Sequence, residues 1–175
     1  VIQFAYHLSR PRDRAQARMR AEALEALAAP FRRAGLLGRD PARYDGLAYG
    51  NVSQREGPGY AITASQRSDQ ATLRAEDVCW AALQRGADEK LEAEGDRPPS
   101  SESLVHEALY RACTGAQAVA HGHHPALWQA RDALALPCTA PEARNGTVAL
   151  AQAVTTLSEG QEAGCLAMAG HRDGM

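Results

Sequence analysis

The sequence has very little lysine. Among its 175 residues Lys90 is the one lysine, and it lies in the acidic segment Asp88-Glu89-Lys90-Leu91-Glu92. A lysine that forms a Schiff base must lose its proton readily, through desolvation or a cationic neighbour, whereas nearby carboxylates favour the protonated amine. The composition therefore argues against lysine-based carbonyl chemistry, and any chemistry on a carbonyl group would have to use a metal ion.

Basic residues are not in excess either. The formal net charge is −2, from 19 lysines and arginines against 21 aspartates and glutamates, and the two signs are interspersed along the chain. No basic stripe is present of the kind that contacts a phosphate backbone. We therefore expect a small-molecule substrate and no nucleic-acid partner.

Long apolar runs and closely paired cysteines are missing as well. No stretch approaches the roughly 18 apolar residues of a membrane-spanning helix, and the segment from Val1 to His7 lacks the apolar region of a signal peptide. The cysteines lie far apart, with no C-x-x-C pair: Cys79, Cys113, Cys138 and Cys165. We expect a soluble, cytoplasmic protein with reduced thiols and no membrane partner.

The length predicts one domain over residues 1–175, large enough to bury a core. An amphipathic helix is expected at about residues 12–36, because apolar side chains recur there at helical spacing. They are Met19, Ala23, Leu24, Leu27 and Phe31. Residues 49–55 and 60–63 predict the two strands of a hairpin, because the Glu56-Gly57-Pro58-Gly59 sequence between them favours a turn.

The second half of the chain alternates between helical and strand patterns. Residues 75–84 are expected to be helical, and residues 86–99, which are polar and charged, to form an exposed loop or a short edge strand. A helix is predicted from Ser100, with Ser100 as its N-cap. Further on, the expected elements are strands at 116–121 and 165–169 and helices at 125–133 and 147–158.

Three histidines carry the chemical signal. His121 and His123 form an H-x-H pair at the end of an expected strand, and alternation along a strand sends both side chains to one face. His171 follows the last expected strand and can complete a three-nitrogen metal site that leaves room for a substrate. On the helix from Ser100, Glu102 and His106 share one face, although Glu102 alone could simply complement the helix dipole.

These residues resemble the class II aldolase/adducin family, whose zinc-dependent members include fuculose-phosphate aldolase and methylthioribulose-phosphate dehydratase. The resemblance runs from about Gly46 to the C-terminus and rests on ordered motifs. They are Gly50-Asn51-Val52-Ser53, Ala61-Ile62-Thr63-Ala64-Ser65, Pro99-Ser100-Ser101-Glu102, His121-Gly122-His123 and Gly170-His171. The resemblance implies an α/β sandwich, with a central, largely antiparallel sheet covered by helices on both sides, assembled as a homotetramer.

Carried over from the family, His121, His123 and His171 bind the metal ion and Glu102 is the catalytic acid/base. Zn²⁺ is the expected ion, with Mn²⁺, Fe²⁺ and Co²⁺ as alternatives. Asn51, Ser65, Ser100 and Ser101 match the pocket for a substrate anion. The ion would stabilise the enediolate of a small hydroxy-carbonyl substrate. The family's epimerases generally carry Asp where this chain has Glu102, which favours an aldolase or a dehydratase.

Two readings from other classes stay open. One is a noncatalytic, adducin-like assembly module, but adducin-type relatives tend to lose the histidines that this chain keeps. The other is an oxygenase with Fe²⁺ in the same histidines, because imidazoles suit both ions.

The sequence also departs from the family pattern. Ala48 stands where a threonine is usual and Gln66 where glycine is expected, which predicts weak binding of a phosphate group. The start of the Ser100 helix should still accept a weaker anion such as a carboxylate, with help from Arg144. The family's catalytic tyrosine has no counterpart, and Tyr110 and His124 are the candidates for the proton donor.

Overall fold

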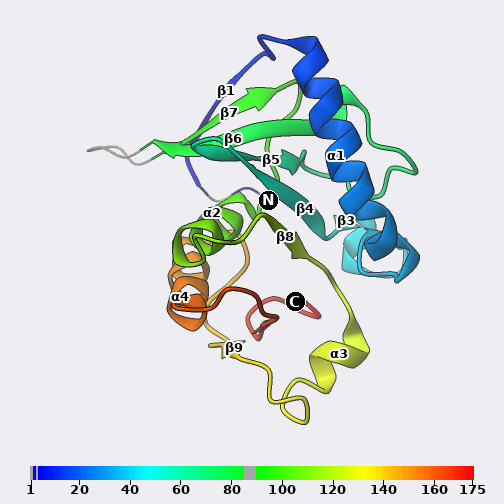
Figure 1. Cartoon of the computed structure of the whole chain (residues 1–175). Helices are drawn as coiled ribbons and strands as arrows, with labels where there is room; N and C mark the ends of the chain where they lie inside the picture. The colour runs from blue at the N-terminus through cyan, green and yellow to red at the C-terminus, as the bar shows by residue number, and fades with distance from the viewer. Residues whose placement is uncertain (1, 3, 85–89) are drawn as a thin grey trace.

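A computed structural model describes residue 2, residues 4–84 and residues 90–175. Within that part of the chain a six-stranded sheet has the strand order β1-β7-β6-β5-β4-β8. Neighbouring strands are antiparallel except β1 and β7, which pair in parallel. Helix α1 covers one face of the sheet, and α2 and α4 lie on the other side (Figure 1). The α/β architecture expected from the sequence is confirmed.

The helices and strands follow one another in this order: β1 (Tyr6–Ser9), α1 (Arg14–Arg33), β2 (Gly38–Arg39), η1 (Tyr44–Gly46), β3 (Ala48–Tyr49), β4 (Asn51–Glu56), β5 (Gly59–Thr63), η2 (Ala75–Asp77), β6 (Val78–Gln84), β7 (Lys90–Gly95), α2 (Ser103–Ala112), β8 (Ala118–His121), α3 (Pro125–Gln129), β9 (Cys138–Thr139), α4 (Val148–Ser158) and β10 (Ala167–Met168).

Strand alternation in the β4–β5 hairpin divides the core between the two faces of the sheet. Tyr60 and Ile62 of β5 pack with Tyr110 of α2, whereas Ala61 between them packs with Leu24 of α1. A period of two residues sends successive side chains to opposite faces. The hairpin predicted from the Gly-Pro-Gly turn is therefore confirmed, and β5 is buried on both of its faces.

Two of the predicted elements are wrong in type or place. Residues 75–84 are not a helix, because only Ala75–Asp77 form a 3-10 turn and Val78–Gln84 form strand β6. Residues 90–95 form β7, which is paired on both sides and so is not an edge strand. Its charged side chains alternate with the buried Leu91 and Ala93, so its polarity hid a regular strand. The part of this prediction at residues 86–89 lies outside the described residues.

The start of α2 also differs from the prediction. The helix begins at Ser103, and its N-cap is Glu102, which makes no side-chain capping bond. Ser100 stands before a preceding turn, where its carbonyl oxygen accepts from the Ser103 N–H at 3.1 Å. A serine and a Glu two residues later fit either arrangement, so sequence could not separate a capped helix from a turn that leads into one.

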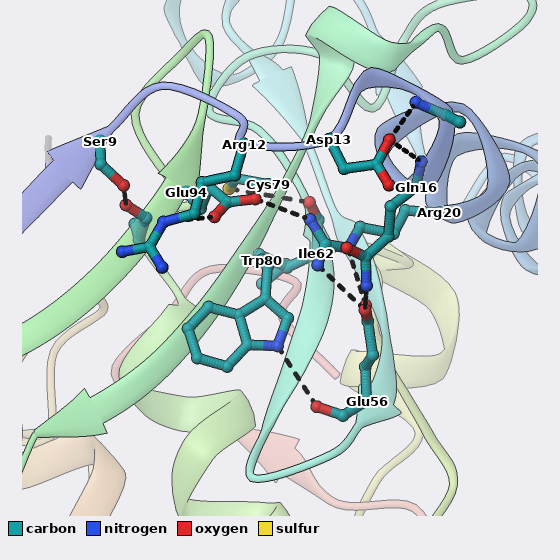
Figure 2. Close-up of polar contacts among 12 residues, drawn as sticks. Ser9, Arg12, Asp13, Gln16, Arg20, Glu56, Ile62, Cys79, Trp80 and Glu94 are labelled. Atoms are coloured by element: carbon teal, nitrogen blue, oxygen red, sulfur yellow. Dashed lines mark hydrogen bonds and ion pairs between the residues drawn. The ribbon is translucent and has the colours of Figure 1, made fainter.

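Helix α1 is anchored to the sheet by buried charge as well as by apolar contact. The Arg20 guanidinium bonds both oxygens of Glu56 on β4, at 2.8 and 2.9 Å, and reaches Glu94 on β7 at 3.4 Å. Gln16 donates to the same Glu56 carboxylate, and Trp80 donates to the Glu56 carbonyl oxygen at 3.2 Å. Figure 2 shows this cluster between the helix and the strands.

In the part of the chain that the structure describes, no helix is both long enough and apolar enough to cross a membrane.

Candidate metal centre

Strand β8 delivers the first two histidines. His121 is its last residue, and His123, two residues later, forms an isolated antiparallel bridge with Gly174. The His123 N–H donates to the Leu36 carbonyl oxygen at 2.9 Å, which holds the backbone extended beyond the strand. As alternation requires, both side chains lie on one side, and their Nε2 atoms are 3.1 Å apart.

The third histidine comes from the turn after β10. The N–H of His171 donates to the Met168 carbonyl oxygen at 3.1 Å, and the Gly174 N–H donates to the His171 carbonyl oxygen at 2.9 Å. Before it, Gly170 runs so close to other backbone that a Cβ there would lie 2.3 Å from the Ala143 carbonyl oxygen. A side chain at this position would push the turn away, so the glycine is needed to place His171.

The three histidines converge on one point. One nitrogen from each of His121, His123 and His171 lies within 4.8 Å of the other two. The ring centroids are 4.7 to 4.8 Å apart. His171, which lies 50 and 48 positions after His121 and His123 in the sequence, thus joins them in one cluster.

Burial keeps these imidazoles neutral. Desolvation lowers the pKa of His121 to about 4 and that of His171 to about 3, and it depresses the pKa of His123 far below its usual range. A neutral imidazole offers a lone pair, and three such donors are the set that leaves open positions on Zn²⁺ or a related divalent ion. The described residues therefore fit a metal ion on the grounds of donor chemistry, convergence and charge state.

Glu102 lies next to this cluster and is only 2 % exposed. Its Oε1 is 3.5 Å from Nδ1 of His171. Neither carboxyl oxygen makes a close hydrogen bond among the described residues, although the Gly146 backbone lies near enough to lower the pKa of Glu102. Burial raises the pKa of Glu102 to about 7. A carboxyl group with such a pKa can both accept and release a proton near neutral pH.

A cavity of about 310 Å³ adjoins the histidines and Glu102. The residues predicted to bind a substrate anion line it: Asn51, Ser65, Ser100 and Ser101. Arg144 is exposed and does not appear among the described lining residues, where Asn145 and Arg172 are found instead. The structure thus brings the predicted site residues together except Arg144.

Gln66 lies in the wall of this cavity with its side chain turned onto the backbone of β3. Its Oε1 accepts from the Ala48 N–H at 2.8 Å, and its Nε2 donates to the Ala48 carbonyl oxygen at 3.2 Å. The residue has a φ of 62°, in the left-handed region that favours glycine. The Gln66 side chain therefore accepts the hydrogen bond of the Ala48 N–H, and this N–H is not available to a ligand.

The two candidates for a proton donor lie elsewhere. The Tyr110 hydroxyl bonds Ser53 Oγ at 2.8 Å inside the core, and burial raises the pKa of Tyr110 to about 12. His124 caps helix α3, where its Nδ1 accepts from the Leu127 N–H at 3.2 Å. Neither residue is among the described residues that line the cavity.

Two aromatic residues that lie beside the histidines could not be predicted from the sequence. Tyr44 in η1 packs edge-on against the His123 ring, with centroids 4.5 Å apart, and Tyr49 of β3 lies 5.7 Å from it. Both tyrosines line the cavity. No spacing or motif links them to His123, because they approach it only through the folding of the loop between β2 and β3.

Comparison with known proteins gives a consistent picture. A family model described as Class II Aldolase and Adducin N-terminal domain matches residues 40–171. The chain is similar in structure to an L-fuculose-1-phosphate aldolase from Thermus thermophilus, with a TM-score of 0.60, 24% identity, and coverage of 89% of this chain and 76% of that one. Another L-fuculose 1-phosphate aldolase has a TM-score of 0.59 and 21% identity over 84% of this chain and 70% of that one.

A relative in sequence comes from Nocardia farcinica. It bears the name "Probable bifunctional methylthioribose-1-phosphate isomerase/methylthioribulose-1-phosphate dehydratase" and is 42% identical over 76 residues. Those residues are 43% of this chain, and the match spans only 13% of that protein's length.

Proposed function

Because this chain belongs to the class II aldolase and adducin family, we propose that it is a divalent-metal-dependent lyase of small hydroxy-carbonyl compounds. Zn²⁺ is the preferred ion, since neutral imidazoles and a site with open positions suit it. The observation that carries the proposal is the pairing of three converging histidines with a buried carboxyl group, Glu102, 3.5 Å from one of them.

A bound divalent ion would supply a Lewis acid that polarises the carbonyl and neighbouring hydroxyl oxygens of the substrate. The chain's own residues handle protons and orientation. Glu102 accepts the proton from the carbon next to the carbonyl group, or returns one to that carbon, and its pKa of about 7 suits both directions. Ser100, Ser101 and Asn51 line the cavity and offer hydrogen bonds to the remaining polar groups.

Two lyase reactions use this arrangement. In a dehydration, Glu102 removes the proton from the carbon next to the carbonyl group and delivers it to the hydroxyl on the following carbon, which leaves as water. In a retro-aldol cleavage, Glu102 takes the proton of the hydroxyl group whose oxygen becomes the new carbonyl, the carbon–carbon bond breaks, and Glu102 delivers that proton to the carbon that becomes electron-rich. The 42% identity to a protein named in part as a dehydratase favours dehydration, whereas the fold shared with aldolases is compatible with both.

The other readings have less support. A noncatalytic assembly module has no need of a buried carboxyl group without a close hydrogen bond, since such a group costs stability. An oxygenase with Fe²⁺ in the same histidines requires an oxidisable substrate and dioxygen, and nothing in the cavity favours that chemistry over proton transfer by Glu102. Epimerisation is a third reaction that can follow removal of the same proton by Glu102.

The experiment is a substrate screen with the purified, metal-loaded protein. Hydroxy-ketones of three to six carbons, with and without a phosphate or carboxylate group, would be incubated with wild-type protein and with Glu102→Gln. Loss of 18 mass units identifies dehydration and a pair of shorter carbonyl products identifies cleavage. Turnover of at least one compound by wild type and not by Glu102→Gln is expected. Absence of both products across the screen, in protein shown to hold metal, would contradict the proposal.

A further inference from the structure

The backbone is strained around the histidine cluster. Five described residues other than glycine have a positive φ, and four of them lie at or beside the site: Tyr44, Asp45, Gln66 and Asp173. Left-handed backbone is unfavourable for a residue with a Cβ and persists only where surrounding contacts hold it. Tyr44 at 51° and Asp173 at 60° are, moreover, partners in one hydrogen bond.

Tyr44 contacts both segments that carry His123 and His171. Its ring packs edge-on against the His123 imidazole, with centroids 4.5 Å apart. Its hydroxyl donates to Oδ2 of Asp173 at 2.8 Å, across 129 positions of sequence. Asp173 lies two residues after His171 and is 7 % exposed, so this bond ties the turn that carries His171 to the loop between β2 and β3.

Arg43 reinforces this contact. Its guanidinium donates to the Tyr44 hydroxyl and lies 3.9 Å from Oδ2 of Asp173. The same group stacks over the Tyr44 ring, 4.8 Å from the centroid. The Tyr44 hydroxyl thus accepts from a cation and donates to an anion, and both interactions hold the ring in one orientation.

His123 needs such support. Metal-binding histidines ordinarily donate their second ring nitrogen to a carbonyl oxygen or carboxylate, which fixes the ring. Nδ1 of His121 has such a contact, 2.9 Å from the Met175 carbonyl oxygen. Nδ1 of His123 makes no close hydrogen bond among the described residues, although the backbone of Arg172 lies near enough to raise the pKa of His123. Packing therefore contributes to the orientation of the His123 ring, and the Tyr44 ring supplies the nearest aromatic contact from outside the histidine cluster.

We propose that Tyr44 is a positioning residue of the metal centre, which aligns His123 through its ring and the His171 turn through its hydroxyl bond to Asp173. The inference rests on the proposed metal site and adds a residue that determines how tightly that site binds its ion. It gives a reason for the strained backbone at both ends of the Tyr44–Asp173 bond. Loss of the bond would let the His171 turn relax and the histidines separate.

The test measures zinc affinity by competition with a chromophoric chelator. Tyr44→Phe keeps the ring and loses the bond, and Asp173→Gly removes the carboxylate while tolerating the positive φ. Each is expected to weaken zinc binding by about 10- to 100-fold, the range for residues that orient metal ligands. The double variant should be no weaker than the worse single variant, because both changes remove one shared interaction.

Tyr110→Phe is the matched control, since it also removes a buried tyrosine hydroxyl bond, to Ser53, and Tyr110 is not among the described residues that line the cavity beside His121, His123 and His171. It should keep wild-type zinc affinity while lowering the melting temperature of the metal-free protein. A Tyr44→Phe protein with wild-type zinc affinity, or with a loss no greater than that of Tyr110→Phe, would overturn the inference. Wild-type protein that binds no zinc would instead contradict the proposed function.

Discussion

The carboxyl group of Glu102 is the residue on which the chemistry depends most. It is buried beside His171 and makes no close hydrogen bond among the described residues. Such a group is retained at a cost in stability, because an unpaired buried charge is unfavourable. The cost is explained if the carboxyl group transfers protons to and from a substrate in the adjoining cavity.

Replacing Glu102 by glutamine should separate activity from folding. We expect turnover to fall by about 10² to 10⁴, the usual contribution of a positioned acid/base. Metal content should stay at the wild-type level, and the melting temperature of the metal-free protein should equal or slightly exceed that of wild type. Steady-state kinetics, metal analysis and thermal unfolding check these points. An unchanged rate on an authentic substrate would assign Glu102 to the helix start alone.

His106 should make stability depend on pH. It is fully buried, its Nδ1 lies 2.6 Å from Ser53 Oγ, and burial lowers its pKa to about 3. The unfolded chain binds a proton near pH 6.5, so the folded state loses stability as pH falls from about 6.5 toward 3, by up to about 1.4 kcal/mol per pH unit. His106→Leu should remove this share of the loss.

Urea unfolding of metal-free protein at pH 7.5 and 5.5 measures the loss of stability that His106 causes. Because His121 and His171 titrate in both proteins, the comparison of wild type with His106→Leu isolates His106. Wild type should lose about 1 kcal/mol more than the variant between the two pH values. Equal losses in wild type and His106→Leu would contradict the assignment.

Gln66 should disfavour phosphorylated ligands. Its side chain occupies the Ala48 amide, and losing one or two charge-assisted hydrogen bonds weakens phosphate binding by about ten- to a thousand-fold. We expect glycolohydroxamate and phosphoglycolohydroxamate to inhibit the wild type about equally. Gln66→Gly, which also relieves the positive φ, should prefer the phosphorylated compound. A strong wild-type preference for that compound would contradict the role given to Gln66.

At the scale of elements, helix α1 is held to the sheet by the Arg20 cluster. The Arg20 side chain is 9% exposed, whereas that of Arg14, which pairs with Asp96, is 57% exposed. Arg20→Met keeps the apolar stem but leaves Glu56 and Glu94 without their shared cation. We expect it to lower the free energy of unfolding by about 1 to 3 kcal/mol. Arg14→Met should change it little. Equal effects in denaturant unfolding would contradict this account.

Elements were predictable from the sequence where local pattern decides them. The β4–β5 hairpin followed from its Gly-Pro-Gly turn, and α1 and α4 from apolar spacing. Strand β6 was not, because alanine and leucine suit either helix or strand and its hydrogen bonds to β5 and β7 made the choice. Strand β7 was hidden by its charged residues. In the structure Glu92 contacts Lys90 and His7, and Glu94 pairs with Arg20.

At the scale of the whole molecule, the site gathers residues from five separate segments. They are β4 with Asn51, the turn after β5 with Ser65, the start of α2 with Glu102, β8 with His121 and the turn after β10 with His171. Motif spacing was enough to propose this set, because family motifs fix residue types in order. Tyr44 and Asp173 could not be found that way, since their contact depends on loops that the motifs leave out.

The metal content of the purified protein tests the central claim most directly. Wild-type protein, purified without added metal and analysed by inductively coupled plasma mass spectrometry, should carry about one divalent transition-metal ion per chain. His123→Ala should lose most of it, because a cluster of three imidazole donors would be reduced to two. Full metal occupancy in His123→Ala, or a wild-type protein that stays free of metal even after incubation with Zn²⁺, would contradict the assignment of His121, His123 and His171 as the metal centre.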